Sequence, residues 1–375
     1  MRNEPAFAKL LILPVLALAL LAGAYFFVQK PGENLKSEPV SGETPTETSP
    51  FEDTAELLPP PTPIPAAKTL VSDYHVYQTF NNCGPASLSM TLSYFGINVS
   101  QKVLGGQLRP YQNPQGDNDD KAVTLQEIGI KAEEYGLLYY LRPMGTPELI
   151  KQFIFNDIPV IALTWLKEGE YIGHFRIIKG YDDNLGVFIQ DDSYQGKNLE
   201  YSYGDFNRLW SAFNYQYIVL VEPAQKEIAE KILGENLDEK VAWESAKEES
   251  ESKLEPSPES IYDRFNLSVA NYYLENYEGA VETYESVSGR LPFRMLWYQI
   301  EPILSYEKLG DDERVLEITG NVLNNENRAF SELYQIRGRI FMKQGDLDAA
   351  REEFEKALYY NENYVLSDEE LALLD

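Results

Sequence analysis

Hydrophobic and polar positions follow two different periods along this chain, and the change of period separates its regions. Between residues 69 and 223, short apolar runs bounded by turn residues predict buried strands at 158–165, 173–181 and 186–190. Apolar residues 88, 92 and 95 fall instead at helical spacing, in a helix that begins at Cys83 and ends at Gly96. We therefore expect a first domain over residues 69–223 that combines a helix with a sheet.

After residue 223 the pattern becomes helical and charged. A charged helical stretch from Lys226 to about Lys253 fills a connector over residues 224–258, which ends in a proline-containing break at 256–258. Beyond it, over residues 259–375, Ala280, Val315 and Ala350 are each 35 positions apart, and so are the turn residues Gly310 and Gly345. This period predicts an all-α domain of stacked helix pairs.

The repeating unit resembles the tetratricopeptide repeat. Residues 331–364 match it most clearly and residues 261–292 match it well, whereas the unit from about residue 296 is degenerate, with Val315 where alanine is usual. Arrays of this kind expose a concave surface that commonly binds peptides or partner proteins. We expect such a protein partner here; a structural cap on the first domain is the alternative.

The N-terminal 68 residues differ from both folded regions. Leu10–Val28 is an uncharged apolar run of 19 residues, long enough to cross ~30 Å of hydrocarbon, and Arg2 and Lys9 precede it. Residues 1–30 are therefore predicted to form a single-pass anchor in the cell membrane, with the rest of the chain on the extracytoplasmic side. Cleavage as a signal peptide, followed by secretion, is the alternative. Residues 31–68 are rich in Pro, Thr and Glu and predict an extended linker.

Composition excludes several classes of function. A net charge of −28 disfavours nucleic-acid binding, and the absence of a Walker-type phosphate loop argues against a nucleotide. One cysteine and two histidines cannot form an internal disulfide and hardly suffice for a zinc cluster. The acidic run 117–120 lacks the glycine and distal glutamate of a calcium loop. We expect no metal and no cofactor.

The same scarcity concentrates any thiol chemistry on few residues. Cys83 starts a predicted helix, where backbone N–H groups and the helix dipole favour a thiolate; an inert buried cysteine is the alternative. Gln78, five residues upstream, could join the Cys83 N–H in an oxyanion hole. The imidazole base must be His174, on a predicted strand, or His75, which we interpret as a surface or packing histidine.

Three motifs in this order resemble the bacteriocin-processing, double-glycine leader peptidases within the papain-like cysteine peptidases. They are residues 82–88 around Cys83, residues 174–182 from His174 onward, and a carboxylate at the end of the next strand. The resemblance covers roughly residues 74–223. It implies an α+β papain-like domain with an N-terminal helix packed on an antiparallel sheet. It also implies Cys83 as nucleophile, His174 as base, an aspartate as orienting residue and Gln78 at the oxyanion hole.

The orienting carboxylate has two candidates in this chain. The family commonly ends that strand in Asp-Pro, whereas Asp191-Asp192-Ser193 stands here. We choose Asp192, because Ser193-Tyr194 would then replace the proline-led turn, and Asp191 remains the alternative.

The predicted function is a membrane-anchored extracytoplasmic cysteine peptidase that acts on a peptide or protein through a Cys-His-Asp triad. Two other hypotheses stay open: a catalytically silent scaffold or binding protein, and an acyl or amide transferase that uses the same thiol. The substrate, the partner of the repeats and the oligomeric state are not predicted.

Overall fold

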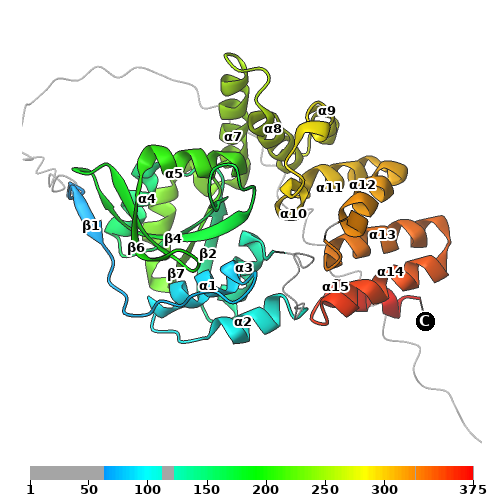
Figure 1. The fold of residues 1–375 in the computed structure, drawn as a ribbon, viewed down its shortest axis with the longest axis horizontal. Helices are drawn as coiled ribbons and strands as arrows, with labels where there is room; N and C mark the ends of the chain where they lie inside the picture. The colour runs from blue at the N-terminus through cyan, green and yellow to red at the C-terminus, as the bar shows by residue number, and fades with distance from the viewer. Residues whose placement is uncertain (1–62, 112–121, 326, 375) are drawn as a thin grey trace, which may run out of the picture. The chain divides into compact units, whose positions relative to one another are not determined.

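The computed structural model describes residues 63–111, 122–325 and 327–374 (Figure 1). The predicted membrane segment Leu10–Val28, nearly all of the linker and the acidic run 117–120 lie outside these ranges. Within them, no helix is both long and apolar enough to cross a membrane.

In the first domain the described residues form one seven-stranded sheet, in which neighbouring strands pair antiparallel in the order β2-β7-β3-β4-β5-β6 and β1 pairs with β4. The strands are β1 (Ala67–Thr69), β2 (Leu138–Arg142), β3 (Val160–Trp165), β4 (Gly173–Asp182), β5 (Val187–Asp192), β6 (Gly196–Ser202) and β7 (Tyr217–Val221). The predicted antiparallel sheet and its three expected strands, β3, β4 and β5, are confirmed.

Strand β4 lies at the centre of the sheet and has two partners along one edge. Its first half pairs with β3 and its second half with β1, while the other edge pairs with β5 and has an irregularity between Ile178 and Gly180. A Cβ atom at Gly180 would lie 2.7 Å from Thr69 Oγ1, so glycine is needed there for β1 to approach. Residues 173–181 are all buried, so the side chains of β4 are held on both faces.

Helices cover both faces of the sheet. They are α1 (Cys83–Ser93), α2 (Gln101–Leu108), α3 (Leu125–Glu133), α4 (Pro147–Phe155) and α5 (Tyr203–Trp210), with a 3-10 turn η1 (Ser211–Phe213). Leu88 of α1 belongs to the same core as Leu163 and Phe175, whereas Phe153 of α4 packs in a second core with Ala162. Alternate residues of β3 thus point to opposite cores, as the strand period requires.

The second region is helical throughout its described part. Its elements are η2 (Pro223–Gln225), α6 (Lys226–Leu233), η3 (Gly234–Leu237), α7 (Glu239–Leu254), α8 (Ile261–Tyr273), α9 (Tyr277–Glu285), η4 (Ser288–Arg290), α10 (Met295–Tyr298), α11 (Glu301–Leu309), α12 (Asp312–Asn325), α13 (Ser331–Gln344), α14 (Leu347–Tyr360) and α15 (Val365–Ala372). The charged stretch from Lys226 to about Lys253 is helical in the structure, but it consists of more than one helix. Gly234 has a φ of +57° and separates two helices, α6 and α7.

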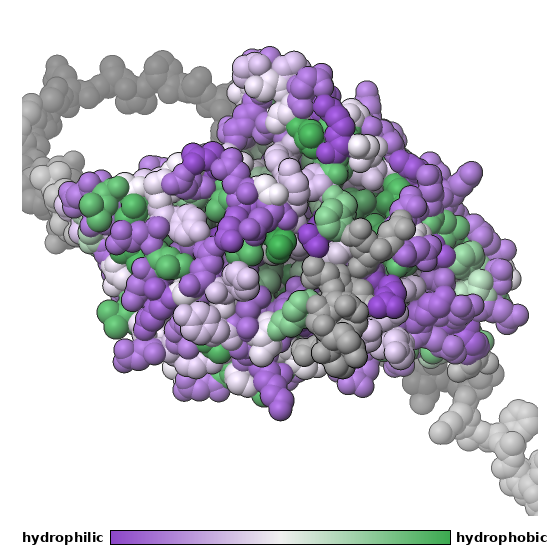
Figure 2. Space-filling model, in the orientation of Figure 1, coloured by the Kyte–Doolittle hydropathy of each residue, from purple (hydrophilic) through white to green (hydrophobic). Residues whose placement is uncertain are grey.

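The helix pairs α8–α9, α11–α12 and α13–α14 correspond to the three predicted units. Ala280, Val315 and Ala350 are each fully buried. Gly310 and Gly345 take left-handed conformations directly after α11 and α13, which explains their recurrence. The predicted period of the helical region is therefore confirmed. On the face seen in Figure 2, hydrophilic residues predominate and hydrophobic ones are scattered.

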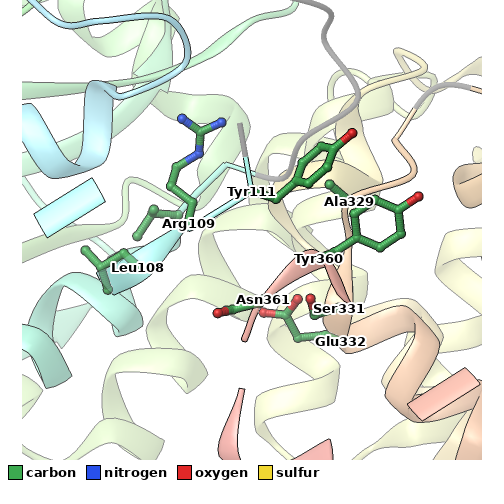
Figure 3. A pocket seen from close by; sticks show the side chains of 9 residues that line it. Leu108, Arg109, Tyr111, Ala329, Ser331, Glu332, Tyr360 and Asn361 are labelled. Carbon is green, nitrogen blue, oxygen red and sulfur yellow. The ribbon is translucent and has the colours of Figure 1, made fainter. Parts of the chain in front are cut away.

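The two regions touch at several places. Asn214 donates to the side chain and the main chain of Asn266 in α8, at 3.2 and 3.1 Å. Near the end of α2, the rings of Tyr111 and Tyr360 meet edge to face at 5.0 Å beside a small cavity, as Figure 3 shows. Nearby, Asn363 donates to the main-chain oxygen of Gly106 at 3.2 Å. The core around α1 accordingly continues into the helical region.

Candidate active site

Cys83 is the first residue of α1, as predicted, and its side chain is only 5% exposed. A first-turn N–H has no acceptor within its own helix, so it is available to a ligand. The turn before it is tightly held. The side chain of Asn82 donates to Thr79 Oγ1 at 2.6 Å and accepts from Arg109 Nη1 at 3.1 Å. Gly105 of α2 leaves room for Asn82, since a Cβ there would lie 3.0 Å from its oxygen.

His174 contacts both of its predicted partners. Its Nε2 lies 2.9 Å from Asp192 Oδ1, and the Cys83 thiol is near enough to help raise the pKa of the imidazole. Because Asp192 occupies Nε2, the nitrogen left for the thiol is Nδ1. A thiol at a helix start, an imidazole and a carboxylate thus lie next to one another in this order, which is the arrangement that thiol nucleophiles use.

The carboxylate of Asp192 is fully buried and fully bonded. Its Oδ1 also accepts the N–H groups of Tyr194 and Gln195, at 2.7 and 2.8 Å. Its Oδ2 accepts from Arg176 Nη1 at 2.7 Å. These donors fix the carboxylate where it holds the imidazole ring in one orientation.

Electrostatics in this series favour a charged pair. Burial by itself would lower the pKa of His174, but its bonds to Asp192 and Cys83 outweigh burial and raise that pKa above the ordinary value. Burial would raise the pKa of Asp192, yet His174, Arg176 and the Gln195 N–H together lower it. An imidazolium formed by accepting the thiol proton would therefore be stabilised by a carboxylate that stays ionised.

Asp191, the alternative orienting residue, points away from His174. Its carboxylate forms a buried ion pair with Lys179, at 2.8 Å between Nζ and Oδ1, and accepts the N–H of Asn198 at 2.9 Å. Neighbouring residues of a strand face opposite sides, so one aspartate meets the histidine and the other meets the lysine. The geometry brings Asp192, and not Asp191, to the imidazole.

Gln78 is held against the turn that follows β5. The Ser193 hydroxyl donates to Gln78 Oε1 at 2.8 Å, and the Gln78 N–H donates to the Ser193 carbonyl at 2.7 Å. With its oxygen engaged, the amide group is oriented so that Nε2 is the remaining donor. Gln101 clamps the same segment, since it donates to the Tyr77 carbonyl at 2.6 Å and accepts from the Thr79 N–H at 3.0 Å.

His75 lies on the outer side of this arrangement. Its Nε2 is 3.0 Å from the main-chain oxygen of Asp192, and its ring packs edge to face on Tyr77 at 5.0 Å. These contacts fit the packing role predicted for His75.

Arg176 is a site residue that the sequence analysis missed. Its side chain has no exposed surface, donates from Nε to Thr164 Oγ1 at 3.0 Å, and lies 4.9 Å from the ring centre of Tyr201. The sequence itself could have indicated this role, because an arginine two residues after His174 in an apolar buried strand needs a buried anionic partner.

The first domain is an α+β domain built on an antiparallel sheet, and the comparison with known families agrees with this fold. Residues 69–218 match the Peptidase_C39 like family, and residues 331–364 match the tetratricopeptide repeat. The chain therefore carries a C39-like peptidase domain followed by a tetratricopeptide-repeat region, which confirms both resemblances seen in the sequence.

Similar solved structures are distant relatives. A protein from Bacillus anthracis described as a C39-like peptidase is 17% identical and has a TM-score of 0.35; the match covers 42% of this chain and 98% of that one. The peptidase domain of Streptococcus ComA, a bi-functional ABC transporter of a quorum-sensing pathway, is 22% identical with a TM-score of 0.30, over 39% and 96% of the two chains. A tetratricopeptide repeat protein from Parabacteroides merdae is 20% identical with a TM-score of 0.31, over 40% and 65%. No curated protein sequence matches the chain.

Proposed function

We propose that this protein is a cysteine peptidase in which Cys83 is the nucleophile, His174 the base, Asp192 the orienting residue and Gln78 part of the oxyanion hole. The observation that carries the proposal is that His174, bonded to Asp192, lies beside the Cys83 thiol at the start of α1. A silent scaffold would have no need of a buried carboxylate with a full set of donors behind the imidazole.

The reaction follows from these positions. His174 accepts the thiol proton at Nδ1, and the Cys83 sulfur attacks the scissile carbonyl carbon. The Cys83 N–H and Gln78 Nε2 stabilise the negative oxygen of the tetrahedral intermediate. His174 then gives its proton to the leaving amine, which departs and leaves a thioester on Cys83. Water, deprotonated by His174, attacks the thioester and releases the acid and the free thiol.

Transfer of the acyl group to an amine remains the second candidate, because it uses the same thioester. Product analysis with and without an added primary amine separates the two outcomes.

For the cellular setting, we propose that Leu10–Val28 anchors the chain and places both folded regions on the extracytoplasmic side. The support is the length of the uncharged run and the position of Arg2 and Lys9 before it. The full chain should sediment with membranes, and protease added from outside should digest its folded regions. A chain released after cleavage near residue 24 would instead indicate a secreted protein.

A thiol-directed activity probe tests the proposed chemistry, since the chain has one cysteine. The native protein should react with an electrophilic peptide probe faster than its own unfolded form does, and Cys83→Ala should abolish both labelling and peptide cleavage without changing the melting temperature by more than a few degrees. Labelling only after denaturation would mean that Cys83 is an inert buried thiol. Cleavage that survives in Cys83→Ala would reject the proposal.

A further inference from the structure

A cavity of about 120 Å³ lies where the peptidase domain meets the helical region, and Phe175, the residue after His174, is part of its lining. One wall is apolar and comes from the peptidase domain, with Leu125, Leu163 and Phe175. The opposite wall carries Tyr298, Gln299 and Glu301, which lie between α10 and the start of α11. Residues more than 120 positions apart in sequence therefore share this space.

Two contacts tie the cavity to the reacting groups. A Cβ atom on Gly84, next to the nucleophile, would lie 3.1 Å from Val123 and 3.4 Å from Phe175, both of which line the cavity. On the other side, the Tyr298 ring fills the space that a side chain on Gly173 would occupy, directly before His174. Burial, with the nearby Cys83, raises the pKa of Tyr298 to about 12, so its hydroxyl stays protonated.

The cavity gathers polar atoms that have no partner among the described residues. These atoms are the oxygen and nitrogen of the Gln299 amide, Gln216 Nε2 and Glu301 Oε2. The three residues are nearly buried, with exposed fractions of 3% for Gln299, 8% for Gln216 and 9% for Glu301. Buried polar atoms are nearly always hydrogen-bonded, and leaving them unpaired is costly. Several such atoms in one cavity indicate that the space is made for a polar occupant.

Glu301 indicates the charge of that occupant. Its Oε1 accepts from the Tyr273 hydroxyl at 3.0 Å, while no lysine or arginine of the described chain forms an ion pair with it. Burial raises the pKa of this carboxyl to about 7. A buried acid without a cation is an uncommon and unfavourable choice, unless the cation is brought by a ligand.

We propose that this cavity is a specificity pocket for a lysine side chain of the peptide substrate, completed by the helical region. Its methylene groups would lie against Leu163 and Phe175, and its ammonium group would donate to Glu301 Oε2 and Gln299 Oε1. An aliphatic side chain would leave these acceptors unpaired, and an acidic one would meet Glu301. Only the statement that the lysine belongs to a peptide substrate rests on the proposed peptidase function, because lysine binding to the pocket can be tested without catalysis.

Binding to the Cys83→Ala protein is the first test. N-acetyl-lysine methylamide should bind about tenfold more tightly than N-acetyl-norleucine methylamide, the gain expected for a charge-assisted hydrogen bond in a buried site. The added change Glu301→Gln should remove this difference, whereas Glu278→Gln, which removes an exposed carboxylate from α9, should retain it. Calorimetry at millimolar ligand measures the affinities of both amides for each of the three proteins.

Cleavage of a peptide library by the active protein is the second test. One position near the cleaved bond should be enriched in lysine, and Glu301→Gln should lose that enrichment while it still cleaves peptides with neutral residues there. Equal binding of the two amides, or a lysine preference that survives in Glu301→Gln, would overturn the inference. Lysine-selective binding without any cleavage would support the pocket and reject the peptidase.

Discussion

At the scale of single residues, the two adjacent aspartates at the end of β5 should respond differently to the same change. Asp192→Asn removes the charge that orients and stabilises His174, and we expect kcat/KM to fall roughly 10²- to 10⁴-fold. Asp191→Asn leaves Lys179 charged and buried without its partner, so we expect a loss of stability of about 3–5 kcal/mol with activity of the folded protein largely kept. Peptide cleavage and urea unfolding of both variants measure these effects.

If Asp191→Asn folds normally but loses catalysis, Asp191 is the orienting residue and the assignment to Asp192 is wrong. Because Asp192→Asn also affects Arg176, its activity should be compared at a temperature well below its own unfolding transition.

Ser193 should act on catalysis through Gln78. We expect Gln78→Ala to lower kcat by about 10²-fold, in the range found for loss of an oxyanion donor, and Ser193→Ala to lower kcat less, with KM nearly unchanged. In the Gln78→Ala background, Ser193→Ala should have no further effect, since the two residues act as one unit. Additive losses would mean that Ser193 supports the strand end and not the amide.

The sequence located the thiol and the histidine but could not decide the carboxylate. The choice between Asp191 and Asp192 depends on which face of the sheet each side chain points to, and the sequence pattern does not settle this at a strand end beside a turn. The choice of Asp192 rested on the turn that follows it, and the contact with His174 agrees. Arg176 was overlooked because strand prediction counts apolar positions and passes over the buried charge among them.

At the scale of elements, the turn between the two helices of each repeat is the same in all three units, although its sequence differs in the first. Gly310-Asp311 and Gly345-Asp346 recur one period earlier as Glu275-Asn276, and Glu275 also takes a left-handed conformation, with a φ of 60°. The second residue of each pair caps the next helix, as Asn276 does by accepting the Gly279 N–H.

This equivalence predicts opposite effects of exchanging glycine with other residues. Glu275→Gly should stabilise the protein by about 1 kcal/mol, because a left-handed conformation is unfavourable for residues with a Cβ atom. Gly310→Ala should destabilise it by a similar amount. Thermal unfolding measures both, and a destabilised Glu275→Gly protein would show that the exposed glutamate makes contacts worth more than the strain.

The strongly patterned elements were predictable from the sequence, and the helix break that the sequence did not reveal has a local cause. Strands β3 and β4 are buried on both sides and β5 on one side, and all three read as apolar runs between turns. Gly234, in contrast, sits within a charged sequence that looks helical on either side, so only its positive φ reveals the break between α6 and α7.

At the scale of the whole molecule, Glu301 should make stability depend on pH. Its pKa is about 7 in the folded chain against 4.5 for an ordinary glutamate, so between these values the folded state holds the proton more firmly. Stability then falls as the pH rises from about 4.5 to 7, by at most about 3 kcal/mol. Glu301→Gln should remove this decrease and unfold at higher temperature at pH 7, and Glu278→Gln should behave like the unchanged protein.

The groups that face Glu301 do not interfere in this range. Tyr272, Tyr273 and Tyr298 adjoin it or line the same cavity, and burial raises the pKa of each above 10. A pH dependence that is the same in Glu301→Gln would mean that other carboxylates control stability. The cavity itself was beyond sequence analysis, because no local pattern relates residue 299 or 301 to residue 84.

The contact of Tyr298 with Gly173 has a thermodynamic consequence. The ring of a residue in the helical region lies against the first residue of the strand that carries His174, so a movement of one requires a movement of the other. Any ligand of the repeats that prefers one position of Tyr298 must change the affinity of the peptidase site for peptides. By reciprocity, peptide binding changes the affinity for that ligand by the same factor, so the two regions form one linked equilibrium.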